Sequence, residues 1–478
     1  MKIRKRFAVP CAVLALTAMS SMASYAATGW VQENDSWVYY NSGNEKATDT
    51  FKKSGNNFYY LDSNGDMVFS SIVEYNDNYF YVNSSGAMVT SEWRTIENEN
   101  GGSDDEPSEW WYYFQSNGKA VKKADNSDSL KFVSINTSTG SSKYTFDEEG
   151  HMLYGWLSSS GEILSDDDAW KNGMYYCGNS NDGSMTTGWK YLEAVNDEDQ
   201  NREEDSYWFW FGNNGKKVTD KETKKINGRK YTFDENGVAK FDWYNNPAKL
   251  STVSSASSYR YYNAEDQCWL SSGWFKAVPD EAADSEGYDD GNEVWYYAKS
   301  NGDLTCSEIK SINGQSYGFD QYGKMLHGLY AITFESNSKT ISSAEKLENT
   351  EDLPETSADD VFVYYFGDSP KEGAMKTGTA TLDIDGEKYI YEFKKSGSKK
   401  GSGTDGISND YIYIEGRRLK AEEGSKYQVV TYNDTDYLIS TNGKLAKSKT
   451  NIKDSDDMYY KTDKNGVVLK VSSEKITD

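Results

Sequence analysis

The stretch from Lys225 to Trp243, KINGRKYTFDENGVAKFDW, places two turn signals around a short aromatic strand. Asn227-Gly228 and Asn236-Gly237 are residue pairs that favour tight turns, and Tyr231 and Phe233 stand at alternate positions between them. The pattern predicts a β-hairpin. Because one hairpin is only marginally stable in water, related hairpins are needed to pack against it.

Related hairpins occur along the whole chain, each with a short aromatic strand that a Gly-containing turn closes. The motifs are WYYFQSNG at Trp111, YWFWFGNNG at Tyr207, VWYYAKSNG at Val294, KYTFDEEG at Lys143, KYTFDENG at Lys230 and SYGFDQYG at Ser316. Stacked hairpins of this kind each bury one face on a neighbour. The sequence therefore predicts an all-β fold, an elongated β-hairpin solenoid of tandem aromatic-rich repeats.

A longer period groups these hairpins into larger units. Tyr144, Tyr231 and Tyr317 are 87 and 86 residues apart, and each unit opens with a Trp that an acidic insertion follows. We expect these insertions to be solvent-exposed loops. The predicted organisation is a signal peptide at 1–26, simple hairpins at 27–92, three units of three hairpins within 93–377 (93–188, 189–273 and 274–377), and Trp-free, degenerate repeats at 378–478.

The first 26 residues have the features of a secretory signal, with four early cations, an apolar run and small residues before the expected cleavage after Ala26. The chain has a net charge of -25, which makes nucleic acid a poor partner. No later segment has the length and apolarity of a membrane span. We therefore expect a secreted, extracellular protein that associates noncovalently with the cell wall.

The second hairpin of each unit indicates which strand face is core. Its aromatic residues stand at strand positions two and four, whereas positions one and three are Lys, Ser, Thr or Gly. Side chains alternate between the two faces of a strand, so the persistent aromatics are predicted to be buried. These core residues are Tyr144, Phe146, Tyr231, Phe233, Tyr317 and Phe319.

The first hairpin of each unit keeps aromatic residues on both faces. The additional rings either pack against the adjacent hairpin or form an aromatic cage for a ligand, and we favour the cage. The third hairpins have Met174, Arg260 and Val363 at the corresponding Trp position, so cages beside Trp156 or Trp243 are expected to lack a wall. The candidate ligand-binding residues are Trp30, Trp37, Trp93, Trp111, Tyr113, Trp189, Trp208, Trp210, Trp274, Trp295 and Tyr297.

The segments Gly178–Trp189, GNSNDGSMTTGW, and Phe146–Trp156, FDEEGHMLYGW, resemble the choline-binding and cell-wall-binding repeat family of Gram-positive surface proteins. This resemblance implies a left-handed β-solenoid in which aromatic boxes hold the choline of wall teichoic acid. Similar repeats in glucan-binding proteins and clostridial toxins imply carbohydrate ligands instead. The partners expected from the resemblance are therefore wall choline or wall and host glycans.

Catalytic chemistry is not indicated. His151 and His327 lie in segments between hairpins, and Cys177 falls at a core position with no histidine in a context that suggests a base. We expect no enzyme activity, no cofactor and no metal site. The leading hypothesis is a noncatalytic wall-binding protein; the alternatives are a carbohydrate-binding adhesin of the same fold and a purely structural surface spacer.

Overall fold

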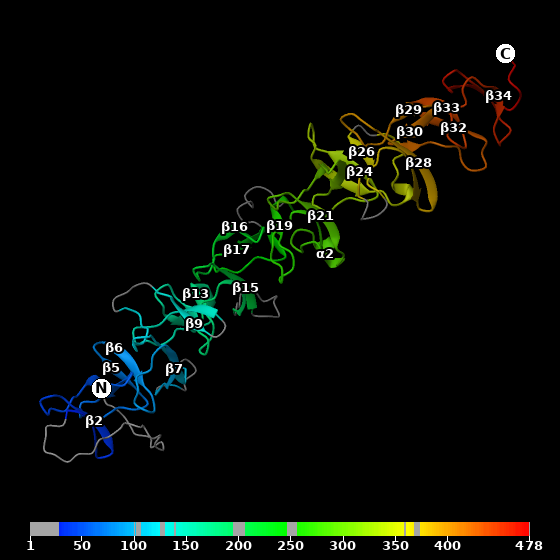
Figure 1. The fold of residues 1–478 in the computed structure, drawn as a ribbon. Helices are drawn as coiled ribbons and strands as arrows, with labels where there is room; N and C mark the ends of the chain where they lie inside the picture. Colours follow the sequence, from blue (N-terminus) through cyan, green and yellow to red (C-terminus); the bar gives the residue numbers. More distant parts are fainter. Residues whose placement is uncertain are drawn as a thin grey trace. The chain divides into compact units, whose positions relative to one another are not determined.

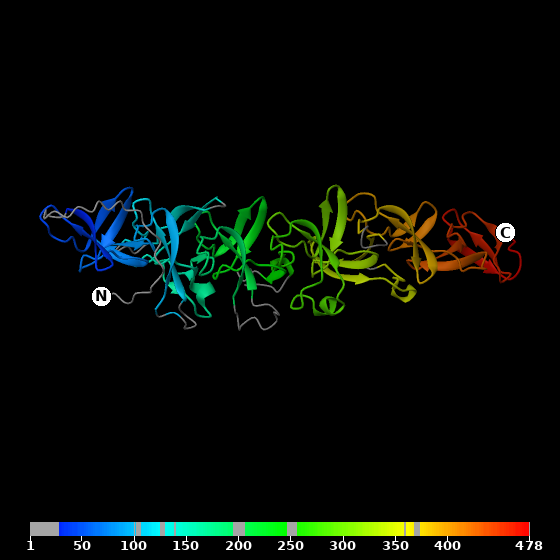
Figure 2. The same cartoon turned by 60° about the horizontal axis from the view of Figure 1, so that its bottom comes forward.

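The computed structural model describes residues 28–99, 101, 107–124, 130–137, 140–194, 206–245, 256–357, 360–367 and 373–477. Within them the chain forms short antiparallel sheets, most of them two-stranded hairpins, which follow one another along the sequence (Figure 1 and Figure 2). The predicted all-β repeat fold is confirmed. The expected signal peptide and most of the first two acidic insertions lie outside the described residues.

Chain contacts divide the protein into two compact units, and the boundary passes through the hairpin of β16 and β17. Unit 1 is residues 1–224 and 232–239, and unit 2 is residues 225–231 and 240–478. In the part of the chain that the structure describes, no helix is long and apolar enough to cross a membrane.

Up to the boundary hairpin, the strands pair with neighbours in sequence, with one exception, and the described residues of this part also include one four-residue helix. The elements are β1 (Gly29–Glu33), β2 (Ser36–Tyr40), β3 (Thr50–Ser54), β4 (Asn57–Leu61), β5 (Ser71–Tyr75), β6 (Asn78–Val82), β7 (Glu92–Glu97), β8 (Glu109–Phe114), β9 (Val133–Thr137), β10 (Gly140–Tyr144), β11 (Gly155–Leu157), β12 (Ile163–Leu164), α1 (Ala169–Asn172), β13 (Tyr175–Cys177), β14 (Gly188–Glu193), β15 (Ser206–Phe211), β16 (Lys221–Ile226) and β17 (Arg229–Phe233). The exception is β11, which pairs with β13 as well as with β12.

The rest of unit 2 continues the pattern and includes one larger sheet, of strand order β27-β28-β31-β30-β29. Its elements are β18 (Trp243–Asn245), η2 (Ala256–Ser258), β19 (Tyr259–Tyr261), β20 (Gly273–Ala277), α2 (Ser285–Asp289), β21 (Val294–Ala298), β22 (Glu308–Ile312), β23 (Gln315–Phe319), β24 (Leu329–Phe334), β25 (Ile341–Lys346), η3 (Thr350–Asp352), β26 (Val361–Tyr365), β27 (Gly378–Ile384), β28 (Glu387–Phe393), β29 (Gly406–Ser408), β30 (Tyr411–Ile414), β31 (Arg417–Arg418), β32 (Tyr427–Tyr432), β33 (Thr435–Ser440), β34 (Thr450–Lys453), β35 (Tyr459–Thr462) and β36 (Val468–Ser472).

The turns have the backbone conformation that their sequences predict. Asn227 and Gly228 have φ angles of 48° and 86°, and Asn34 and Asp35 have 47° and 67°. Two consecutive positive φ angles are typical of the two-residue hairpin turn whose twist matches that of the strands. The turn in the opening stretch is therefore a genuine hairpin turn.

Burial alternates along the aromatic strands as expected. In β8, Tyr112 and Phe114 are buried whereas Trp111 and Tyr113 are half-buried, and β15 and β21 repeat this alternation. Five of the six predicted core aromatics are buried. Tyr317 is the exception: it is half-buried because its ring lies at the rim of a cluster, where its hydroxyl donates to Gln315.

A short segment after each hairpin turn, here called the tie, links that hairpin to the previous one. In the tie of Met152 and Leu153, the Met152 N–H donates to the Trp111 carbonyl of the previous hairpin at 2.8 Å. The next N–H, that of Leu153, donates to the Thr145 carbonyl of its own hairpin at 2.9 Å. Met67, Ala239 and Met325 donate in the same way to Trp37, Trp208 and Trp295.

The side chain of a tie residue packs against a turn glycine farther along the chain. A Cβ built on Gly183, which has a φ of +57°, would lie 2.4 Å from Met152 Sδ, and one built on Gly215 would lie 2.5 Å from Met185 Sδ. The recurring Gly-x-Met pattern thus has a structural cause. The glycine supplies both the positive φ and the room for a methionine.

The acidic insertion at 279–293 is more ordered than the predicted solvent loop. It contains α2, whose N-cap Asp284 accepts a hydrogen bond from the Gly287 N–H at 3.1 Å. Asp284 is only 6% exposed, and Lys324 Nζ lies 2.8 Å from its carboxylate. A buried acid with a cationic partner fastens this insertion to the hairpin that follows it.

Gly183→Ala is expected to lower the free energy of unfolding by about 1 to 3 kcal/mol more than Gly55→Ala, because the added methyl group overpacks the buried Met152 side chain. Gly55 is a matched control in the same unit, with a φ of +59° and open space around the built Cβ. Chemical denaturation of the two variants measures the difference. Equal losses would show that backbone conformation alone explains the glycine.

Candidate functional site

Rings from two consecutive hairpins converge around Trp93 of β7. Trp93 lies opposite Tyr113 in the β7/β8 register, with ring centroids 5.2 Å apart, and its ring is 6.2 Å from that of Trp111. From the next hairpin, Tyr144 and Phe146 approach the Trp93 ring to 4.9 Å and 5.8 Å. We call this group of rings the Trp93 cluster.

The same geometry recurs around Trp274 in unit 2. Its ring lies 6.2 Å from Trp295, 5.2 Å from Tyr297, 4.8 Å from Tyr317 and 5.8 Å from Phe319. These values match those of the Trp93 cluster to within 0.1 Å. Two separate stretches of chain therefore build one arrangement.

Two further clusters follow the pattern in part. The Trp189 ring lies 6.2 Å from Trp208, 5.2 Å from Trp210 and 5.7 Å from Phe233. Trp30 lies 5.4 Å from Tyr39 and 5.6 Å from Tyr59, and the half-buried Trp37 packs against the same core. All eleven candidate residues belong to one of the four clusters, and all eleven are half-buried.

The long insertions leave the clusters intact. Trp93 and Trp111 lie on paired strands, as do Trp189 with Trp208 and Trp274 with Trp295. An insertion at a hairpin tip lengthens the loop without shifting the strand register. The Trp pairs meet at the same 6.2 Å separation in all three long units.

Several residues of the clusters were not among the predicted site residues. Tyr59, Tyr144 and Tyr317 supply a ring from the following hairpin, and Met67, Met152 and Met325 close the associated cores. Tyr144 and Tyr317 were predicted as core only, because strand alternation does not show which neighbour a ring contacts. The Met that follows some of the turns, as at Met67, Met152 and Met325, was the available sequence signal.

The arrangement suits a compact cation. The two Trp rings of a cluster meet at interplanar angles between 77° and 88°, so that they form a corner rather than a flat platform. Ring faces carry negative quadrupole potential, and each face that a cation contacts contributes ~0.5 to 2 kcal/mol. A corner presents more than one ring surface to the same small ligand.

The residue opposite the second Trp differs between clusters. Thr95 lies opposite Trp111, and Tyr191 lies opposite Trp208 with ring centroids 5.1 Å apart. Opposite Trp295 is Lys276, whose ammonium lies 5.3 Å from the Trp295 ring centroid. The chain's own cation therefore covers one ring of the Trp274 cluster.

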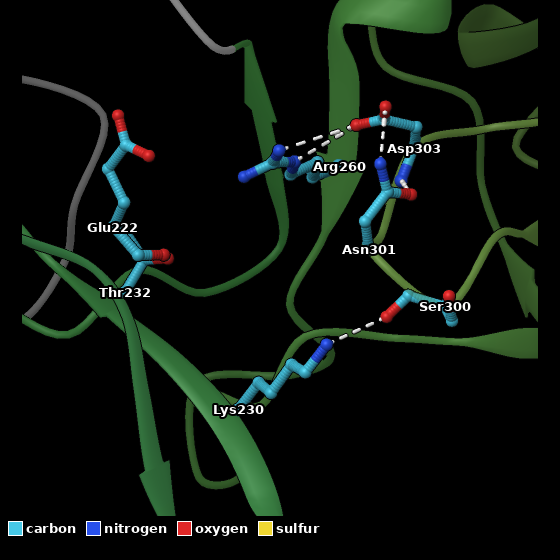
Figure 3. A network of polar contacts seen from close by, with 7 residues as sticks. All are labelled: Glu222, Lys230, Thr232, Arg260, Ser300, Asn301 and Asp303. Atoms are coloured by element: carbon cyan, nitrogen blue, oxygen red, sulfur yellow. Dashed lines mark hydrogen bonds and ion pairs between the residues drawn. The ribbon is translucent and has the colours of Figure 1, made fainter.

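The strand register corrects the expected Trp position of the third hairpin in the second long unit. Trp243 lies opposite Tyr261, as Trp93 lies opposite Tyr113, so Tyr259 and not Arg260 occupies the position of Trp111. Arg260 lies opposite Tyr244, and its guanidinium Nη2 lies 3.3 Å from the Asp303 carboxylate (Figure 3). In the same view, Lys230 Nζ donates to the Ser300 carbonyl at 2.8 Å. Trp243 itself packs against Tyr261, Phe275 and Tyr296. The rings around Trp243 form a hydrophobic core, and the contacts of Arg260 and Lys230 are polar.

His151, which the sequence places in a segment between hairpins, makes specific contacts. Its ring stacks on Trp110 at 4.4 Å, and its Nδ1 lies 2.7 Å from the Asp147 carboxylate. Asp147, Glu149 and His151 place ligand-type atoms within 4.8 Å of one another. The Asp147 carboxylate also accepts the His151 N–H, so this group closes the hairpin turn.

Among the described residues the cysteines form no disulfide, since Cys177, Cys268 and Cys306 are all free. Cys177 is fully buried, as predicted for its core position, and burial raises its pKa to about 12. A thiol with this pKa stays protonated at neutral pH.

No protein-family model and no curated protein matches the chain. The chain is similar to solved choline-binding proteins. CbpJ from Streptococcus pneumoniae TIGR4 has 18% identity and a TM-score of 0.41, with coverage of 74% of this chain and 99% of that one. Choline-binding protein F from Streptococcus pneumoniae has 18% identity and a TM-score of 0.26, with coverage of 77% and 98%. An alternansucrase in complex with isomaltononaose has 14% identity and a TM-score of 0.17, with coverage of 80% and 18%.

Trp93→Ala is expected to lower the free energy of unfolding by about 2 to 4 kcal/mol, because the Trp93 ring bridges two hairpins. Trp111→Ala removes a ring at the edge of the same cluster, and its cost should be clearly smaller. Denaturant titrations of both variants test this ranking. A larger loss for Trp111→Ala would make Trp111 the structural ring of the cluster.

Proposed function

We propose that this chain is a secreted, noncatalytic cell-wall-binding protein whose aromatic clusters hold the quaternary ammonium groups of wall choline. The observation that supports this proposal most directly is the corner of two Trp rings that recurs around Trp93, Trp189 and Trp274. The ring centroids are 6.2 Å apart in all three cases. A repeated arrangement of half-buried rings suits a repeated ligand on a polymer.

The corner geometry favours a cation, and not a sugar, as the ligand. A pyranose ring stacks on a broad exposed ring face, whereas the two Trp rings of each pair meet nearly perpendicular, edge to face, and do not form a flat platform. The trimethylammonium group of choline is compact, weakly hydrated and attracted to several ring faces at once. The net charge of -25 adds a long-range attraction for cations, which salt screens.

Several weak sites on one chain favour a polymeric target. Clusters around Trp30, Trp93 and Trp189 lie in unit 1, and that around Trp274 lies in unit 2. Once one site is bound, the next choline group on the same polymer is held at a high effective concentration. Modest affinity at each cluster therefore suffices for stable attachment to the wall.

The absence of catalysis remains a prediction from the sequence. What supports it is the distribution of residues: the four clusters are built of aromatic rings with Met or Ala at the tie. Trp and Phe rings and thioethers bind ligands but carry no group for proton transfer or nucleophilic attack, so the Tyr hydroxyls are the only such groups among these rings and Met side chains. A wall-binding role requires neither.

Trp111→Ala in the chain 27–478 should lower the number of bound choline groups per chain by one. Trp110→Ala is the matched control, because Trp110 is adjacent and half-buried but belongs to the opposite strand face and stacks on His151. Equilibrium dialysis with labelled choline counts the sites, and Trp fluorescence follows saturation. Thermal unfolding of both variants verifies that the fold is retained.

Saturable binding at millimolar choline that Trp111→Ala reduces and Trp110→Ala leaves unchanged would support the proposal. Binding that both substitutions reduce equally would contradict a site in the Trp93 cluster. Binding of soluble glucan oligosaccharides without binding of choline would indicate a carbohydrate-binding adhesin. Binding of neither ligand would leave the hypothesis of a purely structural surface spacer.

Lys276→Thr is expected to strengthen choline binding at the Trp274 cluster severalfold, because it removes the ammonium that lies over Trp295 and restores the Thr found opposite Trp111. Lys310→Thr serves as the control, since Lys310 is a nearby lysine that pairs with Glu308. The measurement is the choline dissociation constant of each variant by Trp fluorescence. An unchanged constant in Lys276→Thr would show that Lys276 does not compete with the ligand.

A further inference from the structure

A fifth group of rings from two consecutive hairpins lies around Trp156 in unit 1. We call such a contact region between consecutive hairpins a junction. Trp156 of β11 stands opposite Tyr176 of β13 with ring centroids 5.1 Å apart, as Trp93 stands opposite Tyr113. Phe209 and Phe211 of the next hairpin approach the Trp156 ring to 5.4 Å and 5.9 Å. These two rings occupy the strand positions of Tyr144 and Phe146 in the Trp93 cluster.

The tie residue of this junction is Lys217, where the four clusters described above have Met or Ala. Its N–H donates to the Met174 carbonyl at 2.7 Å, as Met152 donates to Trp111. Its side chain runs inward and is 8% exposed. The ammonium lies 5.2 Å from the Trp156 ring centroid and 5.8 Å from that of Phe209.

Two backbone carbonyls complete the surroundings of the ammonium. Lys217 Nζ donates to the Trp170 carbonyl and, at 3.1 Å, to the Lys171 carbonyl. Both carbonyls belong to the last turn of α1, where helix carbonyls lack intrahelical partners. The side chain therefore caps α1 while its charge lies over aromatic rings.

Burial lowers the pKa of Lys217 to about 8, and the nearby Asp234 carboxylate opposes this effect. The group therefore remains largely protonated at neutral pH. The charged form persists in a buried position because rings and carbonyls replace its hydration.

We propose that the Trp156 junction is an aromatic cation site that the chain's own Lys217 ammonium permanently occupies. The two carbonyl acceptors need at least two N–H donors on one nitrogen, which a primary ammonium such as that of Lys217 supplies. A quaternary ammonium has no N–H, so choline is excluded from this junction. That exclusion rests on the proposed function, whereas the internal occupancy does not.

The internal ligand has a structural role that the other junctions lack. It fixes the segment that carries α1, an insertion in the third hairpin of the first long unit, onto β15 of the following hairpin. This junction is then complete without ligand. The number of choline groups bound by the chain is set by the other clusters.

Reductive methylation of the unmodified chain 27–478, followed by mass spectrometry, tests the occupancy directly. Lys217 should react at least about tenfold more slowly than Lys216 and Lys46, because its amine is exposed only when the junction opens. Lys46 is the matched reference: it occupies the tie position of its hairpin, but its ammonium lies 3.7 Å from Glu33. An accessible lysine of lowered pKa would be among the fastest to react, so rapid methylation of Lys217 would overturn the proposal.

A chemical-rescue experiment tests the ligand class. Lys217→Ala should lower the apparent melting temperature by several degrees, and n-propylammonium, which replaces the deleted atoms, should restore a substantial part of that loss. Lys46→Ala should show no such recovery. Tetramethylammonium and sodium chloride at the same concentration control for size and ionic strength.

Recovery by n-propylammonium alone would support a primary-ammonium site. Equal recovery by tetramethylammonium would overturn the assigned ligand class, and equal recovery in Lys46→Ala would overturn the site itself. If Lys217→Ala does not fold, the methylation result on the unmodified chain still decides the occupancy. A wild-type chain that fails to bind choline would refute the proposed function and leave both of these outcomes unaffected.

Discussion

The structure depends on two consecutive backbone N–H groups that donate in opposite directions. In the tie of Met152 and Leu153, one donates to Trp111 of the preceding hairpin and the other to Thr145 of its own. In a lone hairpin these N–H groups would donate to water, and the aromatic face would be exposed to solvent. The tie satisfies the donors and, by fixing the distance between hairpins, places Trp93 and Tyr144 in contact.

Under the proposed function, the aromatic clusters combine stability and ligand recognition in the same side chains. Trp93 is partly core, since it contacts rings from two hairpins, and partly surface, since it is half-buried. Such a residue contributes packing without ligand and offers a ring edge or face to one. The residue opposite the second Trp varies from Thr95 to Lys276, while the separation of the two Trp rings stays at 6.2 Å.

The sequence was sufficient for the repeat class and for the pairing of the aromatic residues. Strand alternation predicted that Tyr112 and Phe114 would be buried on the face opposite to Trp111, and the turn pair Asn227-Gly228 located its hairpin. The contribution of Tyr144 to the Trp93 cluster was not predictable, because contacts between hairpins depend on the spacing that the tie imposes.

Lys217 was missed for a related reason. Its sequence neighbours are those of a surface lysine in a turn, and only the three-dimensional arrangement brings the α1 carbonyls and the Trp156 ring to its ammonium. The ordered insertion around Asp284 is a similar case, because its stability comes from Lys324 in a later hairpin. Both depend on contacts between segments that are distant in sequence.

The tie also has a mechanical consequence. Because each tie joins only adjacent hairpins, a pulling force along the chain is carried in series, and the junction with the weakest contacts yields first. A ligand held between the rings of a junction must be released before that junction opens, so an occupied cluster resists force longer than an empty one. The Trp156 junction, which Lys217 of the same chain occupies, would resist a pulling force equally with and without added ligand.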